Sequence, residues 1–288
     1  MLSDAFLSRL DSLSLAMRGR AAGGAGGVRR SRQLGSSAEF SDYREYIPGD
    51  DIRRLDWNAL ARFDKLFLKL FMEEQESMVT VLVDASASMA EKWPAARDAA
   101  LAVSYLALSG GDRLRLVLLK EKGQGNQEGN RESPVLSGRQ AFARVNAFLE
   151  SGNPDGSEGL AAAVRKVRGL KKGLCFLITD GYTEDALAGV LDDLRYRRQE
   201  CGVIQVMSPF EADPALDGAL RLTDSETGKT LDVLADRSLL EQYRRTLDAF
   251  LAEIRENCRR RETPYLLLDG REPLEQALIP LLSRSGMI

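Results

Sequence analysis

The stretch Met78–Ser88, with the sequence MVTVLVDASAS, decides the fold of this chain. Its first six residues are almost all apolar, and a short apolar run of this length is typical of a buried strand. Asp84 follows at once, and Ser86 and Ser88 stand at every second position after it. One carboxylate and two hydroxyls are hard oxygen donors of the kind that small divalent cations bind. The stretch therefore predicts half of a cation site at the end of a buried strand.

Apolar strand-like runs alternate with helical spacing along the rest of the chain after residue 78. Strands are predicted at 79–83, 114–119, 174–179, 203–207 and 265–268, and a small β excursion at 209–234. Helices are predicted at 94–108, 138–150, 157–168, 184–200, 237–260 and from about 272, with a loop at 121–132. Strands that alternate with helices indicate a mainly parallel sheet covered on both faces. The predicted fold class is therefore α/β, with a doubly wound sheet.

The first 77 residues have a different character. Apolar residues at near-helical spacing predict a short helix over residues 3–18, and the Gly-, Ser- and Arg-rich residues 19–37 predict an irregular segment. Aromatic and charged residues then alternate too densely for a linker, and residues 66–71 predict a strand or hairpin. We therefore expect residues 1–77 to form a small N-terminal module packed on a main domain of residues 78–288.

Composition excludes several classes of protein. The 288 residues are 44% hydrophobic and 29% charged, with a net charge of −3, which is ordinary for a globular protein and gives no sign of nucleic-acid binding. The absence of histidine removes Ser-His-Asp and Cys-His nucleophiles and imidazole metal sites. The three cysteines are far apart, so a zinc site or disulfide framework is not expected. No run is long enough to span a membrane, and we expect a cytoplasmic protein.

Polar side chains follow two of the predicted strands, at the points where the strands end. Asp84 follows the first strand, Asp180 follows the strand at 174–179, and Ser157 opens the helix between them. Each has an ordinary explanation by itself, as a helix cap or a turn residue. In an open parallel sheet, however, ligands bind outside the carboxyl ends of the strands. Together the pattern predicts one metal site made of Asp84, Ser86, Ser88, Ser157 and Asp180.

These segments resemble a known arrangement. Asp84–Met89, Gly156-Ser157-Glu158 and Ile178–Gly181 are similar to the three loops of the metal-ion-dependent adhesion site (MIDAS) in von Willebrand factor A domains. The resemblance implies a von Willebrand A/Rossmann-like fold for the main domain. In that site Ser86 and Ser88 would ligate the cation directly, and Asp84 and Asp180 directly or through water. Ser157 stands where Thr is usual and Glu158 where Asp is usual.

A second resemblance covers nearly the whole chain. The residues that carry it are Glu39-Phe40, Asp42-Tyr43-Arg44, Tyr46, Pro48–Asp51, Arg53, Leu55–Trp57, Arg62, Glu211 and Asp224–Gly228. They resemble the signature of the bacterial domain-of-unknown-function family 58 (DUF58). Proteins of that family are described as carrying a von Willebrand A-like domain and are often encoded beside MoxR-type AAA+ ATPases.

The charged residues of the signature have two interpretations. Asp50, Asp51, Arg53, Arg54 and Asp56 form either an ion-pair network that holds the N-terminal module together or a surface for a partner. The sequence does not decide between them.

The expected function is non-enzymatic, divalent-cation-dependent protein–protein interaction. The cofactor would be one Mg²⁺ (or Mn²⁺ or Ca²⁺), because Mg²⁺ suits a site with few carboxylates and several waters. The partner would present an acidic side chain to the ion, and the resemblance implies a MoxR-type AAA+ ATPase.

Two other functions stay open at this point. One is a metal-dependent hydrolase or phosphatase, with Asp84 as phosphoryl acceptor and Lys171 or Lys172 assisting. Haloacid-dehalogenase-type enzymes, however, carry a second Asp two residues on, where this chain has Ser86. The other is a structural module whose metal site is degenerate, which the Ser157-Glu158 departure keeps open.

Overall fold

The structure is a computed structural model of the chain. It describes residues 2–11, 13, 34–48, 50, 52, 55–63, 65–72, 78–122, 128–156, 159–182, 187–214, 216, 218–223, 228–271 and 273–285. The chain divides into two compact units, a larger one of Met1–Ala25 and Met78–Ile288 and a smaller one of Gly26–Ser77. Helix α1 (Asp4–Leu10), which we expected in the N-terminal module, belongs to the larger unit, because Phe6 and Leu10 are buried in its core.

The larger unit is built on a six-stranded sheet with the strand order β10-β7-β6-β3-β4-β5. The strands are β3 (Met78–Asp84), β4 (Arg113–Lys122), β5 (Glu128–Glu132), β6 (Gly173–Thr179), β7 (Gln199–Val206) and β10 (Tyr265–Leu268). All neighbours run parallel except β4 and β5. The prediction of a mainly parallel sheet is confirmed. The predicted loop at 121–132 is wrong, because its second half is the edge strand β5.

Strands β3 and β6 lie side by side at the centre of the sheet, and every residue of both is buried. Their close approach depends on Gly173, since a Cβ atom there would lie 2.0 Å from the carbonyl oxygen of Met78. From β3 the chain proceeds first to β4 on one side and later to β6 on the other. The carboxyl ends of β3 and β6 therefore flank the point where the strand order reverses, which is where ligands bind in such sheets.

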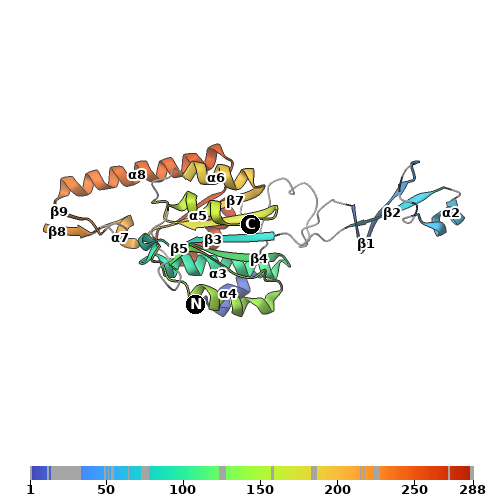
Figure 1. The fold of residues 1–288 in the computed structure, drawn as a ribbon, viewed down its shortest axis with the longest axis horizontal. Helices are drawn as coiled ribbons and strands as arrows, with labels where there is room; N and C mark the ends of the chain where they lie inside the picture. Colours follow the sequence, from blue (N-terminus) through green and yellow to red (C-terminus); the bar gives the residue numbers. More distant parts are fainter. Residues whose placement is uncertain are drawn as a thin grey trace. The chain divides into compact units, whose positions relative to one another are not determined.

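Helices cover both faces of this sheet (Figure 1). Helices α1, α3 (Trp93–Ser109), α4 (Phe142–Glu150) and α9 (Leu274–Ser285) contribute to one hydrophobic cluster. Helices α5 (Leu160–Lys166), α6 (Leu187–Tyr196) and α8 (Arg237–Arg260) contribute to another. Successive side chains of a strand point to opposite faces, and accordingly Val81 and Val83 join the first cluster and Leu82 the second. The predicted doubly wound arrangement follows from this alternation.

The predicted β excursion is a hairpin of β8 (Gly218–Thr223) and β9 (Thr230–Ala235), preceded by the short helix α7 (Pro209–Ala212). It leads into α8, whose first turn is capped by the Asp236 carboxylate, which accepts a hydrogen bond from the Leu239 N–H at 2.8 Å. Only Ile254 and Cys258 of α8 are buried. Helix α8 thus extends past the sheet, and the hairpin lies beside its first half (Figure 1).

The smaller unit is an antiparallel pair of β1 (Leu34–Glu45) and β2 (Phe67–Met72), with helix α2 (Trp57–Phe63) between them in sequence. The strand predicted at 66–71 is confirmed. Strand β1 begins inside the segment that we expected to be irregular. The sequence did not indicate this, because the first residues of the strand, LGSSA, have no alternation of apolar and polar side chains.

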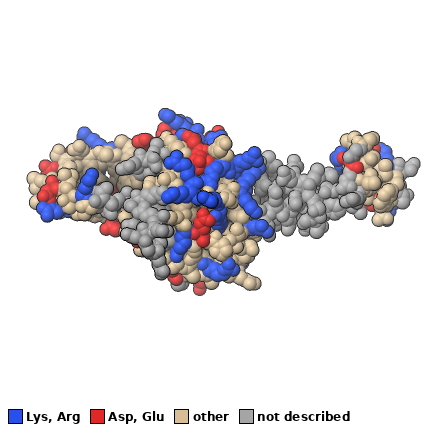
Figure 2. Space-filling view, in the orientation of Figure 1, with Lys and Arg blue, Asp and Glu red and all other residues tan. Residues whose placement is uncertain are grey.

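Basic side chains gather over the middle of the larger unit in the face that Figure 2 shows. The end of α5 and the segment that follows it carry exposed Arg165, Lys166, Arg168, Lys171 and Lys172. Lys171 and Lys172 immediately precede β6, so they lie at the amino ends of the strands, away from the carboxyl ends where the predicted metal site lies.

Candidate metal centre

Three segments meet at the carboxyl ends of β3 and β6. Asp84 is the last residue of β3, and Asp180 follows the last residue of the neighbouring strand β6. The third segment is held there by two backbone hydrogen bonds: Gly156 N–H donates to Ala85 O at 3.0 Å, and Ala87 N–H donates to Gly156 O at 2.8 Å. The structure thus brings together the segments of four predicted ligands. Ser157, the fifth, lies outside the described residues, as does Glu158.

Asp84 is held in one orientation by hydrogen bonds to both of its carboxylate oxygens. The carboxylate is nearly inaccessible, since only 1% of the residue is exposed. Its Oδ1 accepts from the Ser86 N–H at 3.0 Å, and its Oδ2 accepts from the Thr179 hydroxyl at 2.8 Å. Thr179 in turn accepts from the Gly181 N–H at 3.1 Å. Sequence reasoning missed Thr179 as a site residue, because a threonine at a strand end is too common to stand out.

Ser86 and Ser88 place their hydroxyl groups next to each other, with 3.0 Å between the two Oγ atoms. Ser86 is completely buried and Ser88 is half-buried. The chain turns here into a single 3₁₀ turn, η2 (Ala87–Met89). This turn brings Ser88 back toward the strand ends, where its hydroxyl acts to lower the pKa of the Asp180 carboxyl.

Asp180 is also buried, with no exposed surface. Its Oδ1 accepts from the Tyr182 N–H at 3.0 Å, and its backbone carbonyl accepts from Gln205 Nε2 at 2.8 Å. Burial raises the pKa of Asp180, the nearby Asp84 carboxylate raises it further, and Lys92 and Ser88 act in the opposite direction. The raised pKa reflects burial first, and the opposing effects of Lys92 and Ser88 do not offset it.

Lys92 is the basic residue of this site, and sequence reasoning missed it. Its Nζ lies 2.9 Å from Asp180 Oδ2 and 2.7 Å from Glu211 Oε1, and 4.9 Å from the ring centre of Tyr182. Burial lowers the pKa of Lys92, but the two carboxylates outweigh burial, and the pKa is raised above its ordinary value. A single lysine just before a helix belongs to no spacing pattern, so no signal in the sequence could have found it.

This donor set fits a hard divalent cation. With the side chains ionised, this edge holds three negative charges, on Asp84, Asp180 and Glu211, and one positive charge on Lys92, which contacts Asp180 and Glu211. The group therefore has an excess of two negative charges in a largely buried place, which one divalent cation would balance. Within the described ranges no three His, Cys, Asp or Glu side chains are grouped to hold a metal ion, so a cation here would depend on the serine hydroxyls as well.

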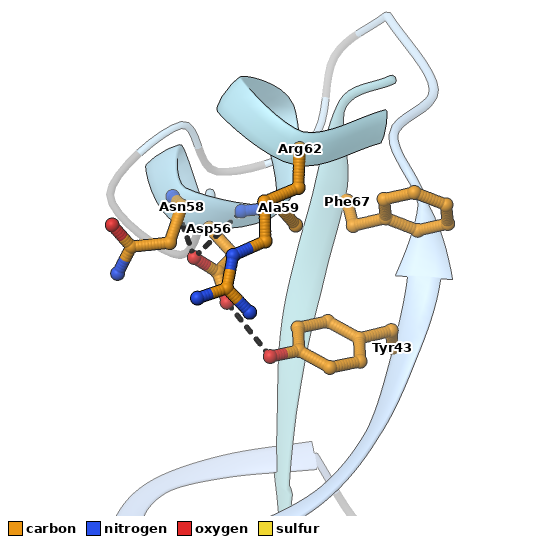
Figure 3. A pocket seen from close by; sticks show the side chains of 6 residues that line it. All are labelled: Tyr43, Asp56, Asn58, Ala59, Arg62 and Phe67. Carbon is orange, nitrogen blue, oxygen red and sulfur yellow. Dashed lines mark hydrogen bonds between the residues drawn. The ribbon is translucent and has the colours of Figure 1, made fainter. Parts of the chain in front are cut away.

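The smaller unit has a separate cavity of about 240 Å³, lined by Tyr43, Asp56, Asn58, Ala59, Arg62 and Phe67 (Figure 3). Asp56 is buried, and its Oδ2 accepts from the Tyr43 hydroxyl at 2.8 Å. Its Oδ1 accepts from the N–H groups of Asn58 and Ala59 at 2.9 and 3.3 Å, at the beginning of α2. Asp56 therefore links α2 to β1, which accounts structurally for the Tyr43 and Asp56 positions of the signature.

The rest of the predicted ion-pair network is described only in part. Arg44 pairs with Asp50 at 2.8 Å, and Asp50 Oδ2 accepts from the Ile47 N–H at 2.9 Å. Asp50 thus closes the turn after β1. Asp51, Arg53 and Arg54 lie outside the described residues.

The fold and the site together define the larger unit as an α/β domain with an oxygen-rich site at the carboxyl edge of its sheet. The family described as "Protein of unknown function DUF58" matches residues 42–252, and the chain belongs to this family. It is 28% identical over 251 residues to the uncharacterized protein Rv1480 of Mycobacterium tuberculosis (strain ATCC 25618 / H37Rv), which covers 81% of this chain and 75% of that protein. The uncharacterized protein Mb1516 of Mycobacterium bovis has the same identity and coverage.

Solved structures give weaker likenesses. The conserved hypothetical protein BatB from Bacteroides thetaiotaomicron is 13% identical with a TM-score of 0.43, over 73% of this chain and 98% of that one. An aerotolerance-related membrane protein from Bacteroides fragilis is 15% identical with a TM-score of 0.41, over 74% of this chain and all of that one. Both scores are below 0.5, so neither structure identifies the fold family. Across the described residues, no helix has the length and apolar character to cross a membrane.

Proposed function

We propose that this chain is a non-enzymatic protein–protein interaction module that depends on a divalent cation, and that its larger unit is a von Willebrand A-like domain. The observation that supports this most is the convergence of Asp84, Ser86, Ser88 and Asp180 at the carboxyl edge of the sheet. The hydrogen bonds of Asp84 and Asp180 fix both carboxylates before any ligand binds, as a binding site requires.

The cation we propose is one Mg²⁺, or Mn²⁺ or Ca²⁺, held by Ser86 and Ser88. Asp84 and Asp180 would contribute charge, directly or through water. Mg²⁺ keeps several waters when it binds proteins, so an acidic side chain of a partner could replace one of them. The cation would supply the charge that attracts this carboxylate, and the chain's own residues would orient the ion toward solvent.

The partner that the family resemblance suggests is a MoxR-type AAA+ ATPase. The two lysines that the sequence offers to a metal-dependent hydrolase do not lie at the site. Lys171 and Lys172, which were considered for that chemistry, are exposed and immediately precede β6, so they lie at the other edge of the sheet.

A binding experiment tests this proposal. The full chain would be immobilised and incubated with the MoxR-type ATPase in Mg²⁺ or in EDTA, with Asp84→Ala as the site variant. Asp4→Ala is the matched control, because Asp4 is an exposed carboxylate in the first turn of α1. We expect recovery of the ATPase to fall with EDTA and with Asp84→Ala and to be unchanged with Asp4→Ala. Equal recovery in all conditions would refute the proposal.

A further inference from the structure

We propose that Lys92 is a positioning residue of the cation site. Its ammonium group is shared between Asp180 and Glu211, and this sharing sets how strongly the site binds a divalent cation. The inference rests on the proposed cation-dependent function and adds to it a residue outside the resemblance to the adhesion site.

The position of the ammonium group is fixed by its surroundings. Only 3% of Lys92 is exposed. The ring of Tyr182 lies against the ammonium group, and that ring is stacked on Phe250 of α8 with 5.0 Å between the ring centres. Water therefore has little access to the ammonium group, and the two carboxylates supply its polar contacts.

Glu211 is fixed as firmly as Lys92. Its Oε2 accepts from the Ser208 N–H at 2.8 Å, and its own N–H donates to the Ser208 hydroxyl at 3.1 Å, which together cap α7. The backbone carbonyl of Glu211 accepts from the Tyr243 hydroxyl of α8 at 2.7 Å. Glu211 therefore draws the lysine charge toward α7, and Asp180 receives only a share of it.

Loss of the side-chain charge should have opposite effects on cation affinity at Lys92 and at Glu211. Lys92 repels a cation at this edge and occupies Oδ2 of Asp180, so loss of its charge should strengthen cation binding. Glu211 adds negative charge and draws Lys92 away from Asp180, so loss of its charge should weaken cation binding. If either residue served only to hold the fold, removal of either would weaken binding.

Calorimetric titration of the EDTA-stripped full chain with MgCl₂ and MnCl₂ at pH 8 tests this. We expect Lys92→Met to bind about tenfold more tightly than the wild type and Glu211→Gln to bind several-fold more weakly, since charges at such short distances in a buried place interact strongly. Lys171→Met is the matched control, because it removes the same charge at an exposed position at the opposite edge, and its affinity should not change.

The outcomes separate this inference from the proposed function. Weaker binding by both Lys92→Met and Glu211→Gln, or unchanged binding by both, overturns the role of Lys92 and leaves the cation site intact. Absence of binding by the wild type overturns the proposed function and this inference with it. If Lys92→Met does not fold, Lys92→Gln, which removes the charge and keeps a polar group, takes its place: tighter binding supports the inference, and unchanged or weaker binding refutes it.

Discussion

The hydroxyl group of Thr179 should stabilise the fold at the carboxyl ends of β3 and β6 even when no cation is bound. The variant Thr179→Val tests this. Valine keeps the shape of threonine but can neither donate to Asp84 Oδ2 nor accept from the Gly181 N–H, the two hydrogen bonds that the hydroxyl makes at 2.8 and 3.1 Å. Both partners are buried, so neither recovers its hydrogen bond from water without local opening.

The expected cost follows from these two bonds. A hydrogen bond to a charged group contributes about 1.5–3 kcal/mol, and a buried donor left without an acceptor costs about 1–3 kcal/mol. Because partial relaxation reduces the sum, we expect Thr179→Val to lower the free energy of unfolding by about 2–4 kcal/mol. Thr179→Ser, which keeps the hydroxyl, should lose only about 1 kcal/mol for the missing methyl group.

The matched control is Thr80→Val in the neighbouring strand β3. Thr80 is 1% exposed, and within the described part of the chain its hydroxyl has no hydrogen-bond partner. Its replacement should therefore be neutral or stabilise the fold by about 1 kcal/mol. Urea unfolding in EDTA, which removes any contribution from bound cation, measures all three variants. Equal destabilisation by Thr80→Val and Thr179→Val would refute the hydrogen-bond argument.

Three further predictions concern the fold. Phe6→Ala should cost about 3–5 kcal/mol of stability in urea unfolding, since Phe6 is in the core of the larger unit; a loss below about 1 kcal/mol would contradict that position for α1. Gly173→Ala should cost about 3 kcal/mol or more in the same assay, because of the contact with Met78, whereas Gly189→Ala in α6, with no atom within 4 Å of its Cβ, should stabilise by about 0.5–1 kcal/mol; similar effects at both positions would be inconsistent with this sheet. Burial raises the pKa of Cys258 from 9.0 to about 12, so its contribution to stability is full below pH 9 and is lost as the pH rises toward 12. In mass spectrometry the folded chain should resist alkylation of Cys258 by iodoacetamide at pH 8, and rapid alkylation would show that this side chain is not buried.

The sequence predicted the elements that have a strong apolar period. Helix α8 has the bounds predicted for it, and β3, β6 and β10 were placed within one or two residues. Strand β5 and helix α2 were missed because neither has such a period: β5 is the edge segment EGNRE, and α2 has only seven residues. An edge strand is stabilised by backbone pairing with one neighbour, which leaves little trace in its side chains.

Some residues of the candidate site could also be predicted from the sequence, and others could not. Asp84, Ser86, Ser88 and Asp180 could be predicted because they stand at or just after the end of a strand, and parallel strands bring their carboxyl ends to one edge. The contact between Lys92 and Glu211 could not be predicted, because it depends on how α7 packs against the sheet, and no local sequence pattern encodes that packing. Their contact joins residues 119 positions apart in the chain.

The most direct test of the central claim is calorimetric titration of the EDTA-stripped chain with MgCl₂, comparing the wild type with Ser86→Ala. The matched control is Ser104→Ala, because Ser104 is also completely buried and its hydroxyl has no hydrogen-bond partner among the described residues. We predict that the wild type and Ser104→Ala bind one Mg²⁺ per chain and that Ser86→Ala loses at least tenfold in affinity, about 1.4 kcal/mol. A wild type that binds neither Mg²⁺ nor Mn²⁺, or a Ser86→Ala variant that binds as the wild type does, would contradict the proposed site.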